Sequence, residues 1–291
     1  MRQRSNSFLS GLAAAAALSL AAATAATAAT IIGDGGPNTL IGTFDRDRIA
    51  ARGGADTVHA LAGRDLVHAG ADDDTVNGGR GADLVLGAHG DDLLNGELGA
   101  DRLLGAAGND RLDGGAGCDR IFAGPDDDTL EGGGGFSFRR FRCERLHGGL
   151  GNDASNGGVG RDFLSGGQGD DAQSGGAGAD KIFANRGRDT SDGGDGHDVL
   201  WALARFDVAA IGDPDGDELT GGEGGDRFRV RDGEVDKIHC GGGRDRVLAD
   251  QFDQVDADCE RVERRDVTSL DQVEDQEENA TESPPEDDDE G

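Results

Sequence analysis

The sequence predicts an all-β fold, a parallel β-roll in which nine-residue repeats stack as a solenoid with two repeats in each turn. Three observations predict it. Glycine is abundant, with 53 residues, whereas the large side chains that fill a conventional core are scarce. A nine-residue period runs from Gly33 to Glu131 without a gap and resumes from Gly148 to Trp201. Three positions of each unit keep their chemistry over the first stretch, which a disordered acidic segment has no reason to do.

Each nine-residue unit has the same chemical pattern, as in GGRGADLVL from Gly78. Position six is aspartate, or asparagine at Asn38, and position eight is aliphatic throughout the first stretch. Position four is glycine or, at Asp45, Asp72 and Asp126, aspartate. Glycine and aspartate tolerate a left-handed backbone better than most residues do. We therefore expect a left-handed turn at position four and a short strand whose position-eight side chain faces the interior.

In the second stretch, position eight alternates between aliphatic and polar side chains. The polar residues are Ser155, Gln173 and Ser191, which recur at every second unit rather than at every unit. One physical turn therefore contains two units, and one of its two sheets carries polar side chains inward here. This alternation favours a two-sided roll over a three-sided helix.

The motif GGxGxDxUx, in which U is aliphatic, resembles the hemolysin-type calcium-binding repeat of the repeats-in-toxin family over about Gly33 to Val262. The resemblance implies a right-handed parallel β-roll in which the first six residues of each unit form a calcium-binding turn. Multiple calcium ions would lie between stacked turns, held by loop carbonyls and by the position-six aspartates. The expected metal ligands are Asp47, Asp56, Asp65, Asp74, Asp83, Asp92, Asp101, Asp110, Asp119, Asp128, Asp153, Asp162, Asp171, Asp180, Asp189, Asp198, Asp217 and Asp226.

The chemistry of the repeat agrees with that implication. Calcium prefers six to eight oxygen ligands, from carboxylates and backbone carbonyls. Stacked turns place like-charged aspartates about 4.8 Å apart, so that each adjacent pair repels by about 1 to 3.5 kcal/mol, depending on the dielectric. Exposed arginines such as Arg46, Arg64, Arg102 and Arg111 are expected to reduce this charge without replacing the ion. We therefore predict that the chain folds on binding calcium.

Residues 132–147 interrupt the period and are interpreted as one unit enlarged by seven residues. With that enlargement, Cys118 and Cys143 lie one turn apart at the same position of their units. Because stacked neighbours are about 4.8 Å apart, a separation that fits a disulfide, we predict a Cys118–Cys143 bond. A second predicted bond, Cys240–Cys259, would close the C-terminal turns as a cap.

The predicted organisation has four parts. Residues 1–28 have the charged start, apolar run and small-residue cleavage sites of a secretory signal peptide. Residues 31–201 form the calcium-binding roll, and residues 202–262 form degenerate repeats and the C-terminal cap. Residues 263–291 form a disordered acidic tail. The mature chain is therefore expected to be extracellular and not inserted into a membrane.

The composition and motifs also limit the function. A net charge of −31 argues against binding nucleic acid and favours cations as partners. No HExxH, GxSxG or CxxC motif is present, and no separate segment remains for a catalytic domain, so we do not expect an enzyme. A structural or binding role at the cell surface or in the extracellular matrix is the leading hypothesis. The alternatives are an accessory module of a secreted hydrolase and a solenoid that binds carbohydrate or ice.

Overall fold

A computed structural model describes residues 28–134, 144–202, 212, 214 and 216–268. Nearly all of the predicted signal peptide, most of the predicted acidic tail and Cys143 lie outside these residues. The described residues contain strands and turns but no helix, and therefore no helix long and apolar enough to cross a membrane.

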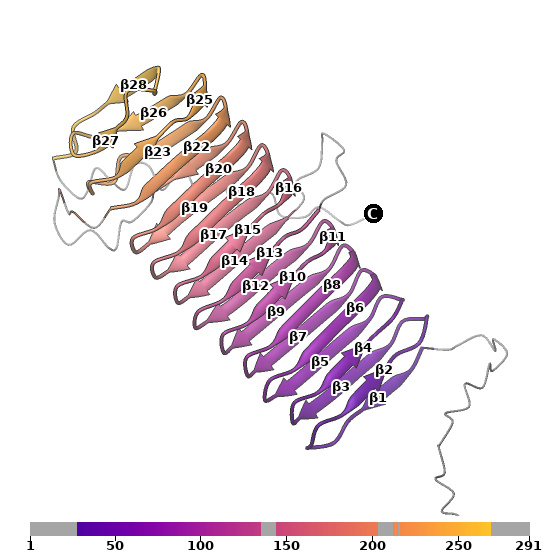
Figure 1. The fold of residues 1–291 in the computed structure, drawn as a ribbon. Helices are drawn as coiled ribbons and strands as arrows, with labels where there is room; N and C mark the ends of the chain where they lie inside the picture. Colours follow the sequence, from indigo (N-terminus) through magenta and orange to yellow (C-terminus); the bar gives the residue numbers. More distant parts are fainter. Residues whose placement is uncertain (1–27, 135–143, 203–211, 213, 215, 269–291) are drawn as a thin grey trace, which may run out of the picture.

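The strands form two parallel sheets that face each other along an elongated molecule (Figure 1). Among the described residues, the first sheet has 13 strands, which are paired in the order β1 (Thr30–Ile32), β3 (Arg48–Gly53), β5 (Leu66–Ala71), β7 (Leu84–His89), β9 (Arg102–Ala107), β12 (Arg120–Pro125), β14 (Arg145–Leu150), β17 (Phe163–Gln168), β19 (Lys181–Arg186), β21 (Val199–Trp201), β23 (Arg227–Val230), β26 (Arg246–Ala249) and β28 (Arg261–Arg264).

The second sheet has 15 strands within the same described residues. Its main path is β2 (Thr39–Ile41), β4 (Thr57–His59), β6 (Thr75–Gly81), β8 (Leu93–Gly99), β10 (Arg111–Asp113), β13 (Thr129–Glu131), β15 (Ala154–Asn156), β18 (Ala172–Gly178), β20 (Thr190–Gly196), β22 (Glu218–Gly224), β24 (Lys237–His239) and β27 (Gln254–Val255). Three short strands pair beside this path: β11 (Ala116–Gly117) with β8, β16 (Val159–Gly160) with β18, and β25 (Gly242–Gly243) with β22.

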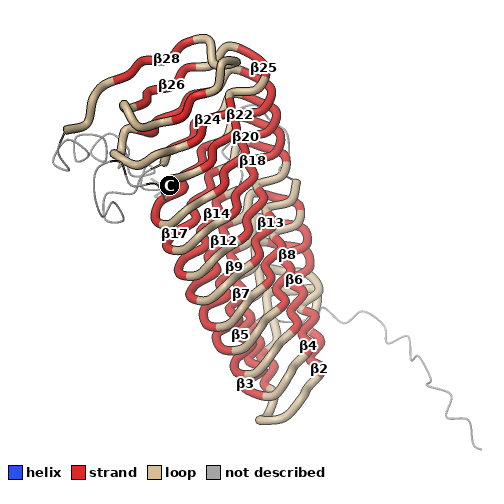
Figure 2. Tube along the Cα trace, turned by 60° about the vertical axis from the view of Figure 1, so that its left-hand side comes forward, coloured by secondary structure: helices blue, strands red, loops and turns tan. Residues whose placement is uncertain are grey.

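The chain alternates between the two sheets at each unit, so that one full turn contains one strand of each (Figure 2). Leu66 of β5 pairs with Leu84 of β7, and Thr75 of β6 pairs with Leu93 of β8, a step of two units in both sheets. The structure thus confirms the predicted all-β parallel roll, with about 12 turns. We call residues 48–131, where this step is constant, the regular array.

The step changes where the sequence departs from the repeat. It is 25 residues between β12 and β14, where Ile121 pairs with Leu146. After β21 the step is 28 residues, because Trp201 pairs with Arg229 of β23. It shortens again between Ile238 and Val255 near the end of the second sheet. We call residues 216–264, which contain these last irregular steps, the cap turns.

The core between the sheets is a stack of position-eight side chains. Val85, Leu94, Leu103 and Leu112 are 0% exposed, and each faces its counterparts one turn before and after. This packing is why an aliphatic residue recurs at this position. In the cap turns Phe228 takes the same place and is also fully buried.

The predicted row of inward polar residues is present in the second sheet. Ser155 pairs with Gln173, which pairs with Ser191, and all three side chains are buried. The Ser191 hydroxyl donates to Gln173 Oε1 at 3.1 Å. The polar residues therefore partly satisfy one another, although the Ser155 hydroxyl has no hydrogen-bond partner.

The backbone turns left-handed at two positions of the unit, where the sequence pointed to one. At position four, Asp72 and Asp126 have φ angles of 75° and 82°, as expected, whereas Asp45 does not adopt this conformation. The backbone of Asp45 makes other hydrogen bonds: its N–H donates to the Thr43 hydroxyl, and its carbonyl accepts from the same hydroxyl. Position two is also left-handed, even where it is not glycine, as at Ala88 with a φ of 98°.

The C-terminal strand β28 extends beyond the predicted start of the acidic tail. It includes Glu263 and Arg264, whose strand pairs with β26. Arg246 Nη2 lies 3.1 Å from Glu263 Oε2, and Arg231 Nη2 donates to the Glu263 carbonyl at 3.0 Å. These arginines explain why acidic Glu263 belongs to the folded body.

Candidate metal-binding edges

The position-six carboxylates form a ladder along each of two edges of the roll. Each residue lies just before a strand, and its N–H donates to the carboxylate one turn later. Asp74 N lies 2.8 Å from Asp92 Oδ1 on one edge, and Asp83 N lies 2.7 Å from Asp101 Oδ1 on the other. Each carboxylate therefore connects two consecutive turns through one of its oxygens.

The ladders contain every predicted ligand. The first ladder, which precedes the strands of the first sheet, runs through Asp47, Asp65, Asp83, Asp101, Asp119, Glu144, Asp162, Asp180, Asp198, Asp226, Asp245 and Glu260. The second ladder runs from Asn38 through Asp56, Asp74, Asp92, Asp110, Asp128, Asp153, Asp171, Asp189, Asp217, Asp236 and Asp253. The 18 predicted aspartates are all at most 3% exposed.

The second oxygen of these carboxylates is buried and has no hydrogen-bond partner. This holds for Oδ2 of each predicted ligand other than Asp47 and Asp189, and Oδ2 of Asp47 accepts from Thr43 N. A buried charged oxygen without a partner is costly. Such an oxygen at every step is therefore a strong indication that something besides the protein neutralises it.

The space beside these oxygens is lined by oxygen and kept open by glycine. A Cβ at Gly78 would lie 3.2 Å from Asp83 Oδ2 and 3.1 Å from the carbonyl oxygen of Gly96, one turn later. The same arrangement recurs at Gly96, beside Asp101 Oδ2 and the carbonyl of Gly114. Carboxylate and carbonyl oxygens are the ligands that calcium prefers, so the residues present fit this ion.

Burial and like charge both act on the ladders. Burial, assisted by the neighbouring carboxylates Asp110 and Asp74, raises the pKa of Asp92 to about 7. Burial likewise raises the pKa of Asp101 to about 7, with Asp119 and Asp83 as the like-charged neighbours. The carboxylates therefore resist ionisation in the calcium-free roll.

The arginines that were expected to reduce the charge form no ion pair with the ladders. Arg46, Arg64, Arg102 and Arg111 form no ion pair with any described residue. The buried carboxylates beside them therefore need a bound cation or, as their raised pKa values indicate, a proton to compensate their charge.

Five acidic ladder members were not among the predicted ligands: Glu144, Asp236, Asp245, Asp253 and Glu260. Glu144 is fully buried, and its Oε2 accepts from Asp119 N at 2.7 Å. Burial raises its pKa to about 9, with Asp119 and Asp162 adding like charge. The sequence signal for Glu144 was its place at position six of the enlarged unit. The sequence signal for the others was weaker, because they follow the preceding ladder residue by 19, 17 or 15 residues instead of the 18 residues of two repeats.

At the other end, the second ladder begins with an amide instead of a carboxylate. Asn38 Oδ1 accepts from Asp34 N at 2.8 Å, and Asn38 N donates to Asp56 Oδ1 at 2.6 Å. The asparagine continues the hydrogen-bonded ladder without adding a buried charge at the N-terminal end.

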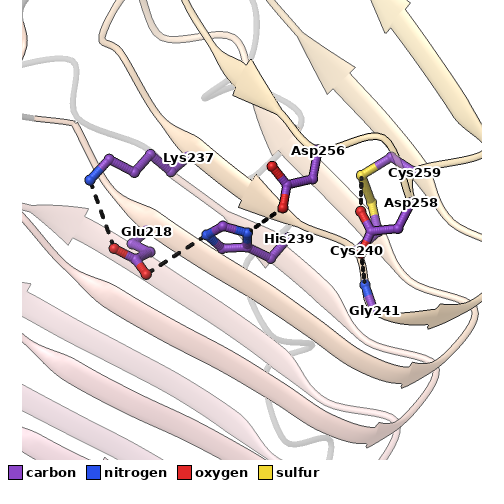
Figure 3. Close-up of polar contacts among 8 residues, drawn as sticks. All are labelled: Glu218, Lys237, His239, Cys240, Gly241, Asp256, Asp258 and Cys259. Atoms are coloured by element: carbon purple, nitrogen blue, oxygen red, sulfur yellow. Dashed lines mark hydrogen bonds and ion pairs between the residues drawn. A yellow bond between two sulfur atoms is a disulfide. The ribbon is translucent and has the colours of Figure 1, made fainter.

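A disulfide closes the cap turns (Figure 3). Cys240 and Cys259 are bonded, with their Cα atoms 5.2 Å apart, which confirms that predicted pair. On the outer face nearby, His239 Nδ1 lies 2.7 Å from Asp256 Oδ2 and its Nε2 lies 3.8 Å from Glu218 Oε1. The predicted bond between Cys118 and Cys143 includes a residue outside the described part of the chain and stays a prediction.

Comparison with known proteins agrees with this geometry. The family model of the RTX calcium-binding nonapeptide repeat matches residues 32–67, 53–85, 68–103, 104–138, 145–172 and 174–200. These matches together cover more than half of the chain. The search of curated proteins found no match. Stacked buried aspartates in repeats of this kind are consistent with multiple calcium sites. The chain therefore belongs to the family of RTX calcium-binding nonapeptide repeat proteins.

Proposed function

We propose that this protein is a secreted calcium-binding structural protein that folds when calcium binds between its stacked turns. The observation that supports this proposal is the row of buried, unpartnered carboxylate oxygens along both ladders. A chain that buries these charges without a cation is strongly destabilised. Calcium binding to the folded state alone would therefore drive folding.

The 18 aspartates named as expected ligands are the proposed ligands, and Glu144, Asp236 and Asp245 extend the same two rows. Their Oδ1 atoms hold consecutive turns in register through backbone N–H groups. Their Oδ2 atoms, with carbonyl oxygens of the glycine-rich loops, would contact the ion. Calcium supplies positive charge that converts the repulsion between turns into coordination.

We infer that the protein acts outside the cell, at the cell surface or in the extracellular matrix, and that it is not an enzyme. The signal-like pattern of residues 1–28 supports the location. The repeat family, which is typically non-catalytic, supports the second inference. The alternative of an accessory module of a hydrolase would require a catalytic partner chain.

An aromatic row on the first sheet bears on the remaining alternative, a carbohydrate-binding solenoid. The rings of Phe183 and Trp201 stack with centroids 4.3 Å apart, and Phe163 lies 4.9 Å from Phe183. Trp201 is only 6% exposed, however, so it offers little ring face to a sugar. The row therefore supports packing along the sheet better than ligand binding.

A calcium titration of the mature chain tests the proposal. Circular dichroism should show little β-structure in chelator and a cooperative gain with calcium, near the roughly 0.1–1 mM range of extracellular modules. Calorimetry should show a melting transition that moves upward with calcium concentration. Complete β-structure in chelator, or no response to millimolar calcium, would contradict calcium-dependent folding.

Substitution within one loop makes the test specific. Asp92→Asn keeps an oxygen for the ladder hydrogen bond but removes a charged ligand, and should destabilise the calcium-bound roll by roughly 1.5–3 kcal/mol. In chelator the same change should stabilise any folded population, because it removes a buried charge. Asp91→Asn is the matched control, since Asp91 is exposed in the same loop. It should change the stability of the roll appreciably neither in calcium nor in chelator.

A further inference from the structure

One turn of the cap departs from the repeat by burying three acidic side chains. This turn connects β23 and β24 and reads Arg231-Asp232-Gly233-Glu234-Val235-Asp236. Asp236 occupies position six, as the pairing of Lys237 with Glu218 shows. Asp232 and Glu234 then fall on positions two and four, which are glycine in the motif and carry no buried carboxylate in the regular array. We call Asp232, Glu234 and Asp236 the cap cluster.

The cap cluster is buried and its oxygens converge. Asp232, Glu234 and Asp236 are 1%, 3% and 0% exposed, and one carboxylate oxygen from each lies within 4.8 Å of the other two. Asp232 Oδ1 accepts from Glu234 N, and Asp236 Oδ1 accepts from Asp217 N at 2.8 Å. The other oxygens, Asp232 Oδ2 and Asp236 Oδ2, are buried without a hydrogen-bond partner.

The turns on either side add negative charge. Asp217 precedes the cluster in the second ladder, and Asp250 Oδ2 accepts from Gly233 N at 2.9 Å. Among the described residues, no arginine, lysine or histidine forms an ion pair with Asp232 or Asp236. Arg264 is close, but its Nη1 donates to the carbonyl oxygen of Asp250. The charge of the cluster is therefore not balanced by a basic side chain on either aspartate.

We propose that the cap cluster binds one calcium ion, for which Asp232 and Glu234 supply ligands that the nonapeptide sites lack. Two oxygens bound to the same calcium ion at roughly 2.3–2.6 Å lie no more than about 5.2 Å apart. The three oxygens of the cluster meet that limit. An all-carboxylate donor set suits a hard cation and offers nothing to a soft one. Three charged ligands from a single turn should bind calcium more tightly than one aspartate per turn, because affinity rises with ligand charge.

This inference goes beyond the proposed function, because it needs buried carboxylates at positions two and four, which the regular array does not have. The ion would hold the β23–β24 connection, between the second ladder and the disulfide at Cys240. Calcium binding at the cap cluster can therefore be lost while calcium binding at the repeat sites is kept.

Counting bound ions tests the inference. Native mass spectrometry of the mature chain should show one calcium fewer in Asp232→Asn/Glu234→Gln than in the unchanged protein. Calorimetric titration should show loss of the tightest binding step, while circular dichroism in calcium shows the same roll. The control is Glu218→Gln/Glu223→Gln, which removes the same charge from half-exposed Glu218 and exposed Glu223 in β22 and should keep every ion.

A milder variant covers the case in which the double variant does not fold. Glu234→Asp keeps the charge but shortens the side chain, and should weaken one site by roughly tenfold or more. An unchanged ion count and unchanged affinities in the folded double variant, or in Glu234→Asp, would overturn the inference and leave a protonated cluster. A parent protein that binds no calcium would instead overturn the proposed function.

Discussion

The regular array and the cap turns are built on the same ladder but are held together by different interactions. In the regular array the step is always two units, and an aliphatic core lies between two rows of buried aspartates. In the cap turns the step is irregular, and a disulfide joins Cys240 to Cys259. Ion pairs such as Arg246–Glu263 and Arg261–Glu263 add to the links within the cap.

The difference shows that a regular repeat has no side chains with which to neutralise its own buried carboxylates. Each turn of the array uses its glycines to let carbonyl oxygens and a carboxylate approach one another, and a glycine offers no side chain that could neutralise the charge. The cap turns replace glycines by residues such as Arg231 and Asp232, which make contacts of their own. The array therefore depends on an external cation, while the cap has covalent and ionic links within the protein in addition to its buried carboxylates.

The largest expected effect is the response of the regular array to pH without calcium. Burial raises the pKa of Asp92 and Asp101 in the array to about 7. A raised pKa means that the folded roll binds protons more tightly than the unfolded chain. The calcium-free array should therefore be most stable below the unfolded pKa of about 4, and should lose stability as the pH rises to about 7. Circular dichroism in calcium-free buffer should thus show more β-structure at pH 5 than at pH 8.

In the cap turns burial also raises the pKa of Asp226 to about 7 and of Asp253 to about 8, so the calcium-free cap should respond as the array does. Hydrogen bonds from Arg246 and Arg261 lower the pKa of exposed Glu263, so that surface contact is lost as the pH falls through the lowered value. The calcium-bound protein should respond in the direction opposite to that of the calcium-free roll. Calcium requires ionised ligands, so acid should weaken its binding to the array. Hydrogen exchange can follow the two regions separately. A calcium-free array that loses β-structure between pH 8 and pH 5 would contradict the burial of charge described for the ladders.

Removing the disulfide should affect the cap more than the array. Cys240→Ser/Cys259→Ser opens a loop with a sequence separation of 19 residues, for which the chain-entropy model gives about 3 kcal/mol. In saturating calcium, hydrogen exchange should accelerate in β24 to β28, while β5 to β10 should keep their protection. Equal acceleration in both regions would show that the cap supports the whole roll, and would remove the distinction drawn between them.

The array could be predicted closely from the sequence, because each of its structural requirements falls on a fixed position. An aliphatic residue at position eight predicted the core, and the aspartate at position six predicted the buried ladder. The polar residues Ser155, Gln173 and Ser191 predicted two units per turn, because they recur at every second unit and lie in one sheet.

The cap could be predicted only in part. The Cys240–Cys259 pair was predicted as a bond that closes the last turns, but the cap cluster was not predicted. Asp232 and Glu234 do not follow Asp217 by a whole number of units, so no fixed period places them beside it. Their carboxylates converge with that of Asp236 within one turn, through side-chain positions that the repeat pattern does not describe. The left-handed backbone at position two was also missed, because several residue types occupy it.

The smallest expected effect concerns this position-two backbone. In the cap turns the residues with left-handed φ at position two are glycines, such as Gly222 and Gly241, whereas the array also holds Ala88 there with a φ of 98°. A left-handed conformation costs an L-residue about 1–2 kcal/mol, and a glycine costs about 0.5–1 kcal/mol in chain entropy. Ala88→Gly should therefore stabilise the calcium-bound array by up to about 1 kcal/mol in thermal or urea unfolding.

The neighbouring Ala107→Gly is the control for that substitution. Ala107 pairs with His89 in the next strand of the same sheet and does not have a left-handed φ. Its replacement removes no strain, so it should destabilise the array by about 0.5–1 kcal/mol. If both substitutions destabilise equally, Ala88 carries no backbone strain. A left-handed alanine at position two would then cost the array no more than a glycine costs the cap. The dependence of the array on calcium would come from the charge of the ladders alone.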